Sequence, residues 1–145
     1  MIASQIMNRK IVTVEMDDGL HVINDIFRHV KFHHLLVIQG KSLVGVISDR
    51  DFLKAISPFI HTLSEREQDR ATLNLKAHQI MTRNPITAYK NEKVETVANK
   101  MFKNNISCIP IVNKNGNVEG IITIKDILKW FLSKTGYSTQ AERNK

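Results

Sequence analysis

The sequence predicts an α+β protein built from two β-α-β-β-α repeats. Three observations favour this fold class. The stretch GVISDRD (45–51) returns as GIITIKD (120–126), and QIMNRKIVTV (5–14) returns as QIMTRNPITA (79–88). Each copy also contains a segment with helical apolar spacing, followed by two β-branched runs joined by a turn. An internal repeat of this length indicates two similar structural units.

The elements of the two repeats follow in the same order. Each repeat begins with a short extended segment, IVTV (11–14) or PITA (85–88). Apolar residues at helical spacing then predict an amphipathic helix in each repeat: Leu20, Ile23, Ile26, Phe27 and Val30, and later Val94, Val97, Met101 and Phe102. Two strands come next, 35–38 with 43–48 and 109–112 with 117–123. The final helix of each repeat carries DFLKAI (51–56) or DILKWFL (126–132).

These patterns divide the chain into four segments. We expect a first repeat over 1–57, a charged helical linker over 58–77, a second repeat over 78–136 and a polar tail over 137–145. Neither repeat is large enough to bury a good core alone, so we expect the two to pack together. In the linker, Ser64 and Glu67 have the spacing of a capping box. The linker is interpreted either as a solvated helix or as a docking element carried by Phe59, Ile60 and Leu63.

Composition limits the function classes. Hydrophobic residues make up 42% of the chain and charged residues 24%, as in globular proteins. No apolar run reaches the roughly 18 residues of a membrane span, and the first residues lack a signal-peptide pattern, so we expect a cytoplasmic protein. The formal net charge of +7 favours anionic partners, but the basic residues are scattered. The single cysteine, Cys108, cannot form an internal disulfide and is expected to be a small buried apolar residue.

The repeated heptapeptide supports two interpretations. Ser48 with Asp51, and Thr123 with Asp126, have the spacing of a capping box at the start of an apolar helix. A strand that ends at a helix N-terminus is also a place where backbone N–H groups attract phosphate. There a hydroxyl can donate to a phosphate oxygen and a carboxylate can accept from ribose hydroxyls. Both functions are compatible with the same residues.

Together these motifs resemble a tandem pair of CBS domains, known as a Bateman module. The resemblance rests on the doubled β-α-β-β-α order, on HLLVI (34–38) and CIPIV (108–112), and on G-x-x-[ST]-x-x-D at each last helix. It covers nearly the whole chain, which is similar to stand-alone bacterial proteins of the acetoin-utilisation type. The resemblance implies that the repeats pack through their sheets with pseudo-twofold symmetry. It also implies two clefts for adenine nucleotides or other adenosyl compounds.

The resemblance assigns residues to each cleft. In cleft A, Ser48 would contact phosphate, Asp51 would contact the ribose, and the base at the phosphates would be Arg50, with His34 as a further base. In cleft B, the corresponding residues would be Thr123, Asp126 and Lys125, and Cys108 occupies the position of His34. Because Cys108 is uncharged, we expect cleft B to hold phosphates less tightly or to prefer a ligand with less negative charge. The adenine walls would be Val46, Ile86 and Ile106 in cleft A, and Ile121, Val12 and Phe32 in cleft B.

The resulting hypothesis is a non-catalytic regulatory module. AMP, ADP, ATP or S-adenosylmethionine would bind as a regulatory ligand, with no required cofactor, and a protein effector would read the conformational change. The chain is expected not to be an enzyme, because it shows no nucleophile motif, Walker lysine or metal-ligand spacing. We expect a homodimer, with Trp130 and Phe131 on its apolar surface. The alternatives are a scaffold with empty clefts and a basic nucleic-acid-binding protein.

A metal site is not expected. His33 and His34 are adjacent, and adjacent residues on a strand point to opposite faces, so the two rings cannot easily share one ion.

Overall fold

The computed structural model describes residues 1–136 of the 145-residue chain, so the predicted polar tail lies outside the described residues. The chain forms two compact units. Unit 1 consists of Met1–Lys10, Ile86–Lys114 and the segment from Glu119 onward, and unit 2 consists of Ile11–Pro85 with Asn115–Val118. Each unit combines strands with helices, so the predicted α+β class is confirmed.

Unit 2 is built on a four-stranded sheet in the order β1-β2-β3-β4. The strands are β1 (Thr13–Glu15), β2 (His34–Gln39), β3 (Ser42–Ser48) and β4 (Thr82–Arg83). β1 runs parallel to β2, whereas the β2–β3 and β3–β4 pairs are antiparallel. Gly40 has φ of 65° between β2 and β3, a left-handed conformation that glycine adopts without steric cost.

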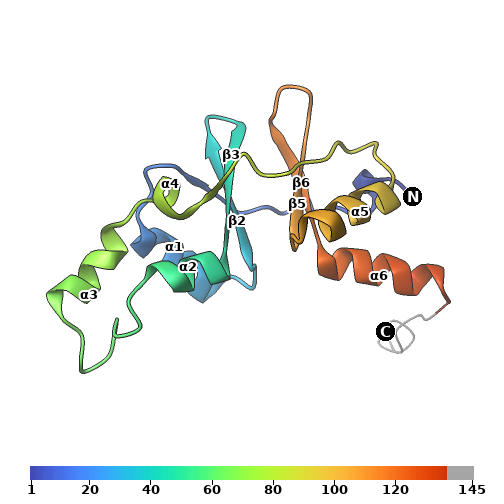
Figure 1. Ribbon diagram of the computed structural model, residues 1–145. Helices are drawn as coiled ribbons and strands as arrows, with labels where there is room; N and C mark the ends of the chain where they lie inside the picture. Colours follow the sequence, from blue (N-terminus) through green and yellow to red (C-terminus); the bar gives the residue numbers. More distant parts are fainter. Residues whose placement is uncertain (137–145) are drawn as a thin grey trace. The chain divides into compact units, whose positions relative to one another are not determined.

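The helices of unit 2 are α1 (Leu20–His29), α2 (Asp49–Ala55), α3 (Glu67–Ala71) and α4 (Ala77–Ile80), with a 3-10 turn η2 (Thr72–Asn74). α1 buries Leu20 and Ile23, which are fully buried and lie three residues apart on one face. These residues join Leu35, Val37 and Ile47 from the sheet in one apolar core. Figure 1 shows α1 and α2 beside the β2–β3 hairpin.

Unit 1 contains the corresponding hairpin of β5 (Cys108–Val112) and β6 (Val118–Thr123). Its helices are α5 (Val94–Asn104) and α6 (Ile124–Lys134), with a 3-10 turn η1 (Ala3–Gln5) near the N-terminus. α5 ends at Asn105, whose φ of 51° is left-handed, as is common after the last turn of a helix. The core contains Val97 and Met101 from α5 together with Ile109, Ile111 and Ile122 from the hairpin. The β-α-β-β-α order of the two repeats is therefore confirmed, although the first extended segment of the second repeat, PITA, is only a bridge at Ala88.

The compact units do not coincide with the sequence repeats. The N-terminal residues pack in unit 1: the Ala3 N–H donates to Glu92 O at 2.8 Å, and Asn8 and Ile121 exchange two backbone hydrogen bonds of 2.9 and 3.0 Å. The equivalent residues of the second repeat pack in unit 2, where Thr82 pairs with Val46. Each unit therefore takes its QIM segment from the other repeat.

Each QIM methionine packs against the glycine of a heptapeptide. Met81 lies against Gly45, and Met7 lies against Gly120. A Cβ atom on Gly120 would lie 2.9 Å from Met7 Sδ and 3.0 Å from Asn8 O, closer than side chains normally approach. The repeated glycine thus allows the exchanged QIM segment to approach the strand.

The predicted capping box at Ser64 and Glu67 is wrong. α3 begins at Glu67, and its N-cap residue is Arg66. The Arg66 N–H donates to Asp69 Oδ2 at 2.8 Å, and Asp69 also accepts a 2.7 Å hydrogen bond from Ser57 Oγ. Asp69 lies three residues after Arg66 and is already fixed by Ser57, so it sets the start of the helix. The docking residues proposed for the linker remain exposed in part: Phe59 is 51% exposed, and Leu63 is fully exposed.

Candidate functional site

The first heptapeptide lies where β3 ends and α2 begins. Ser48 is the N-cap of α2 and its Oγ accepts a 3.0 Å hydrogen bond from the Asp51 N–H. In return the Ser48 N–H donates to Asp51 Oδ2 at 2.9 Å. These two reciprocal bonds satisfy N–H groups that lack a partner within the helix. The predicted capping box is therefore confirmed.

The second heptapeptide has the same arrangement between β6 and α6. Thr123 is the N-cap, and its N–H donates to Asp126 Oδ2 at 2.8 Å. Thr123 Oγ1 donates to the same oxygen at 3.0 Å and accepts a longer bond of 3.4 Å from the Asp126 N–H. Both heptapeptides thus place a hydroxyl, a carboxylate and a helix N-terminus together.

The two carboxylates keep one oxygen for another contact. The capping hydrogen bonds that the Asp51 and Asp126 side chains accept are all made through Oδ2. Both side chains are half-buried, and the capping bonds hold each carboxylate in position at the start of its helix. Each Oδ1 is an acceptor suited to a hydroxyl of a bound ligand.

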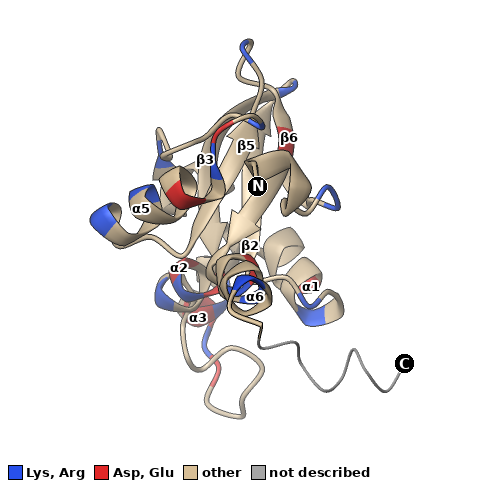
Figure 2. Cartoon of the chain, turned by 90° about the vertical axis from the view of Figure 1, so that its right-hand side faces the viewer, with Lys and Arg blue, Asp and Glu red and all other residues tan. Residues whose placement is uncertain are grey.

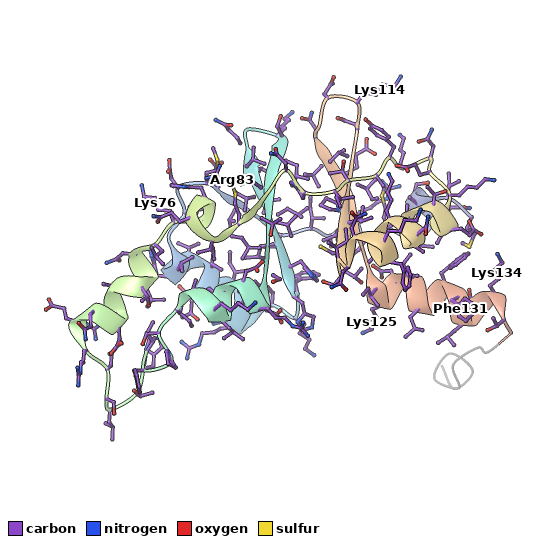
Figure 3. The ribbon with its side chains drawn as sticks, viewed as in Figure 1. Lys76, Arg83, Lys114, Lys125, Phe131 and Lys134 are labelled. Carbon is purple, nitrogen blue, oxygen red and sulfur yellow. The ribbon has the colours of Figure 1, made fainter. Side chains whose placement is uncertain are left out.

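A basic side chain accompanies each pair. Arg50 and Lys125 each lie one residue before the carboxylate and are exposed. Figure 3 shows Lys125 at the beginning of α6. We refer to Ser48, Arg50 and Asp51 as the first site, and to Thr123, Lys125 and Asp126 as the second site.

His34, which the sequence predicts as a further base of cleft A, lies beside the first site. It begins β2 and pairs with Ser48 across the sheet. Burial lowers the pKa of His34 below its ordinary value, and this effect outweighs the attraction of Asp49 and Asp51, which acts in the opposite direction. The ring is therefore mostly neutral at pH 7, and it adds little positive charge for a phosphate.

Asp49 is a charged residue of the first site that the sequence interpretation missed. It is the first residue of α2, its N–H donates to His33 O at 2.9 Å, and its Oδ2 lies 2.9 Å from His33 Nδ1. Its side chain remains 41% exposed. The signal was present in the sequence, because the equivalent position of the second repeat is the uncharged Ile124.

The remaining predicted site residues divide between the units. Unit 2 contains Val46, which is 8% exposed, and the half-buried Val12 and Phe32. Unit 1 contains the buried Ile121 and Cys108 and the half-buried Ile86 and Ile106. Each predicted adenine wall draws residues from both units, so these walls stay predictions. The expected burial of Cys108 is confirmed, with 8% of its surface exposed.

The described residues contain neither a metal-binding cluster nor a membrane-spanning helix. No group of three or more His, Cys, Asp or Glu side chains between residues 1 and 136 is placed to hold a metal ion. Over the same residues, no helix has the length and apolar character needed to cross a membrane.

Sequence comparison identifies the class of protein. A model of the CBS domain family matches residues 3–58 and 77–133, the two repeats. The chain therefore belongs to the CBS domain family and carries two such domains in tandem.

Individual relatives agree with this assignment. The CBS domain-containing protein DDB_G0289609 of Dictyostelium discoideum is 29% identical, and the match covers 88% of this chain and 89% of that protein. The crystal structure of the CBS domain pair of protein MJ0100, in complex with 5′-methylthioadenosine and S-adenosyl-L-methionine, is 30% identical, with a TM-score of 0.74. That match covers 92% of this chain and 98% of the other. A Vibrio cholerae structure assigned to acetoin utilization (AcuB) is 20% identical with a TM-score of 0.74 and coverage of 94% and 93%, which shows the fold alone.

Other relatives are much longer proteins. The chain spans 36% of an uncharacterized protein of Methanocaldococcus jannaschii, MJ1225. It spans 24% of a homoserine O-acetyltransferase of Methanococcus vannielii and 19% of an L-aspartate semialdehyde sulfurtransferase of M. jannaschii. The chain therefore matches only a minor part of each of these three relatives.

Proposed function

We propose that this protein is a non-catalytic regulatory module that binds an adenosyl ligand at its two heptapeptide sites. The observation that carries the proposal is the duplicated arrangement of hydroxyl, half-free carboxylate and base at both sites, in a chain of the CBS family. The MJ0100 domain pair, which is 30% identical over nearly its whole length, binds two adenosyl compounds and supports this ligand class.

The chemistry of each site fits such a ligand. In the first site, Asp51 Oδ1 would accept hydrogen bonds from the ribose hydroxyls, and Arg50 and the Ser48 hydroxyl would face the group attached to the 5′ carbon. In the second site, Asp126, Lys125 and Thr123 would have the same functions. The capping bonds through Oδ2 hold each carboxylate in place before the ligand arrives, so little side-chain entropy is lost on binding. Val46, Ile86 and Ile106, and likewise Ile121, Val12 and Phe32, remain the proposed adenine walls.

No chemical step is assigned to the module. The relatives with enzyme names are matched over about a quarter of their length or less. The module would instead transmit a ligand-dependent conformational change to a protein effector, which requires different ligand affinities in two states.

A homodimer in the cytoplasm is the proposed assembly. The outer face of α6 exposes Ile124, Leu128 and Phe131, each 54% exposed. They lie at i, i+4 and i+7, so they form one apolar stripe along the helix. Trp130, by contrast, is half-buried, and the Lys134 ammonium lies 5.0 Å from its ring centre. The stripe on α6 is the surface that we expect a second copy to cover.

The test is calorimetric titration of the full chain with AMP, ADP, ATP and S-adenosylmethionine. Asp51→Asn and Asp126→Asn keep a side-chain oxygen for the cap and remove the charge. Asp69→Asn is the matched control, because Asp69 caps α3 in the same way outside both sites. We expect micromolar binding of at least one ligand, weakened by Asp51→Asn or Asp126→Asn and unchanged by Asp69→Asn.

Failure of all four ligands to bind to folded wild-type protein would refute the proposal. The heptapeptides would then act only as helix caps, in a scaffold that binds protein partners. Equal weakening by all three variants would also contradict it, since a general loss of stability would then explain the effect.

A further inference from the structure

The net charge of the protein is confined to one unit. Within residues 1–136, unit 1 contains ten Lys and Arg against four Asp and Glu, whereas unit 2 contains nine of each. Figure 2 shows several of these basic residues of unit 1 on α5 and α6. The second site belongs to the basic unit, and the first site belongs to the neutral one.

The immediate surroundings of the two sites differ in the same direction. The first turn of α2 contains two acidic residues, Asp49 and Asp51, whereas that of α6 contains only Asp126. The position of Asp49 is taken by Ile124 in the second site. Asp49, Arg50 and Asp51 together give the first site one net negative charge. Lys125 and Asp126 together give the second site no net charge.

The histidines do not reverse this difference. His34 is half-buried and has a lowered pKa, and His33 contacts Asp49 with a ring that is 75% exposed. The ring of His34 therefore adds little positive charge to offset Asp49. The presence of His34 in the first site and of Cys108 in the second therefore does not make the first site the better phosphate site.

We propose that the two sites select ligands of different charge: the second site takes a phosphate-bearing adenine nucleotide, and the first site takes an uncharged or cationic adenosyl compound. This assignment rests on the proposed function and adds the ligand class of each site. It reverses the order of phosphate affinity that the His34 and Cys108 positions implied.

The physical basis is the charge at the first helical position. A carboxylate there lies beside the N–H groups and the hydroxyl that would hold a phosphate. Two like charges about 6 Å apart in a partly solvated site repel enough to change affinity roughly tenfold. The same carboxylate attracts a cationic group such as a sulfonium, and it is indifferent to a neutral thioether.

The test exchanges this one residue between the sites. Ile124→Asp introduces the acidic residue of the first site into the second, and Ile124→Asn is a matched control of the same size without the charge. Ile124 is 54% exposed and aspartate is favourable in a first turn, so the variant is expected to fold. Both variants remove the same apolar residue from the stripe on α6, so a change in the dimer would affect them alike. Asp49→Asn removes the charge from the first site. AMP and 5′-methylthioadenosine are the probes, titrated at pH 8 and low salt.

We expect Ile124→Asp to weaken AMP binding roughly tenfold, compared with less than threefold for Ile124→Asn, and neither to change 5′-methylthioadenosine binding. Asp126→Asn should weaken AMP, and Asp51→Asn should weaken 5′-methylthioadenosine. Asp49→Asn should strengthen AMP binding at the first site.

Two results would overturn the assignment: AMP binding that is lost in Asp51→Asn and kept in Asp126→Asn, or equal AMP affinity in Ile124→Asp and Ile124→Asn. If wild-type protein binds neither probe nor any other adenosyl compound, the proposed function fails and the assignment fails with it. That outcome is recognised in wild-type protein before any variant is measured.

Discussion

The contact between Gly45 and Met81 gives a prediction that isolates the exchanged QIM segment. Gly45 is not among the glycines with positive φ, so alanine can adopt its backbone conformation. A Cβ atom there would contact Met81 Sδ and lie 2.8 Å from its Cγ and 3.0 Å from its Cβ. Normal carbon contacts are about 3.5–4.0 Å, so β3 and the Met81 segment would have to separate by roughly 0.5–1 Å. We expect Gly45→Ala to lower the free energy of unfolding by about 1–3 kcal/mol.

A double-mutant cycle tests the cause. Urea titration of wild type, Gly45→Ala, Met81→Ala and the double variant should give a coupling energy of at least about 1 kcal/mol, because Met81→Ala removes the Cγ and Sδ atoms that obstruct the new methyl group. Gly40→Ala is the control, since no atom lies within 4 Å of its added Cβ and its cost arises from its φ of 65°. It should not couple to Met81.

Met81→Ala leaves Met81 Cβ 3.0 Å from the new methyl group, so a small part of the cost of Gly45→Ala should remain. The second repeat should keep a larger part, because its remaining contact is with a backbone oxygen hydrogen-bonded to Ile121. The Cβ added to Gly120 would also lie 3.0 Å from the backbone oxygen of Asn8, which Met7→Ala does not remove. Gly120→Ala should therefore keep part of its cost in a Met7→Ala background. Additive effects of Gly45→Ala and Met81→Ala would refute the reasoning, since they would mean that the two residues are not in contact.

The remaining predictions concern the cap, an ion pair and the proposed dimer surface. Ser48→Ala should lower the free energy of unfolding by about 1 kcal/mol in the absence of ligand, through loss of the Asp51 N–H acceptor, and thermal melting checks this. An unchanged melting temperature would contradict the stabilising function of the Ser48 cap. Burial acts to raise the pKa of Glu92, but hydrogen bonds, including one of 2.7 Å from Lys100, outweigh it and the pKa is lowered. A carboxyl group whose pKa is lower in the folded state than in the unfolded state stabilises the fold at pH values above its ordinary pKa of about 4.3. This stabilisation is lost as the pH falls through the lower pKa of the folded state. Urea titrations at several pH values should therefore show Glu92→Gln less stable than wild type at pH 7, by less than about 1 kcal/mol, with the difference vanishing in acid. A difference in stability that is the same at every pH would exclude the Glu92–Lys100 ion pair as the cause. Phe131→Lys on α6 should shift the chain toward monomer in light scattering, and an unchanged mass would remove the apolar stripe from the dimer surface.

Much of the local structure was determined by the sequence alone. The helices α1, α5 and α6 and the two hairpins lie where apolar periodicity and turn residues placed them. The caps at Ser48 and Thr123 follow from residues only three positions apart. The predicted capping box at Ser64 and Glu67 was wrong because it overlaps with a second capping pattern at Arg66 and Asp69. The hydrogen bond from Ser57, twelve residues before Asp69, favours the second pattern.

The tertiary structure decided which segments pack together. The repeat pattern assigns residues 5–7 and 79–81 to equivalent places, but it does not say which hairpin each one covers. That choice depends on non-local contacts, Met7 with Gly120 and Met81 with Gly45, which no local propensity encodes. The excess of basic residues, by contrast, is already present in chain order: residues 78–136 contain nine Lys and Arg against four Asp and Glu, and the exchange of segments raises this only to ten against four in unit 1. The charge difference between the two sites is thus set mainly by the sequence, whereas the pairing of each QIM segment with a hairpin is set by non-local packing, because folding decides which distant segments become neighbours.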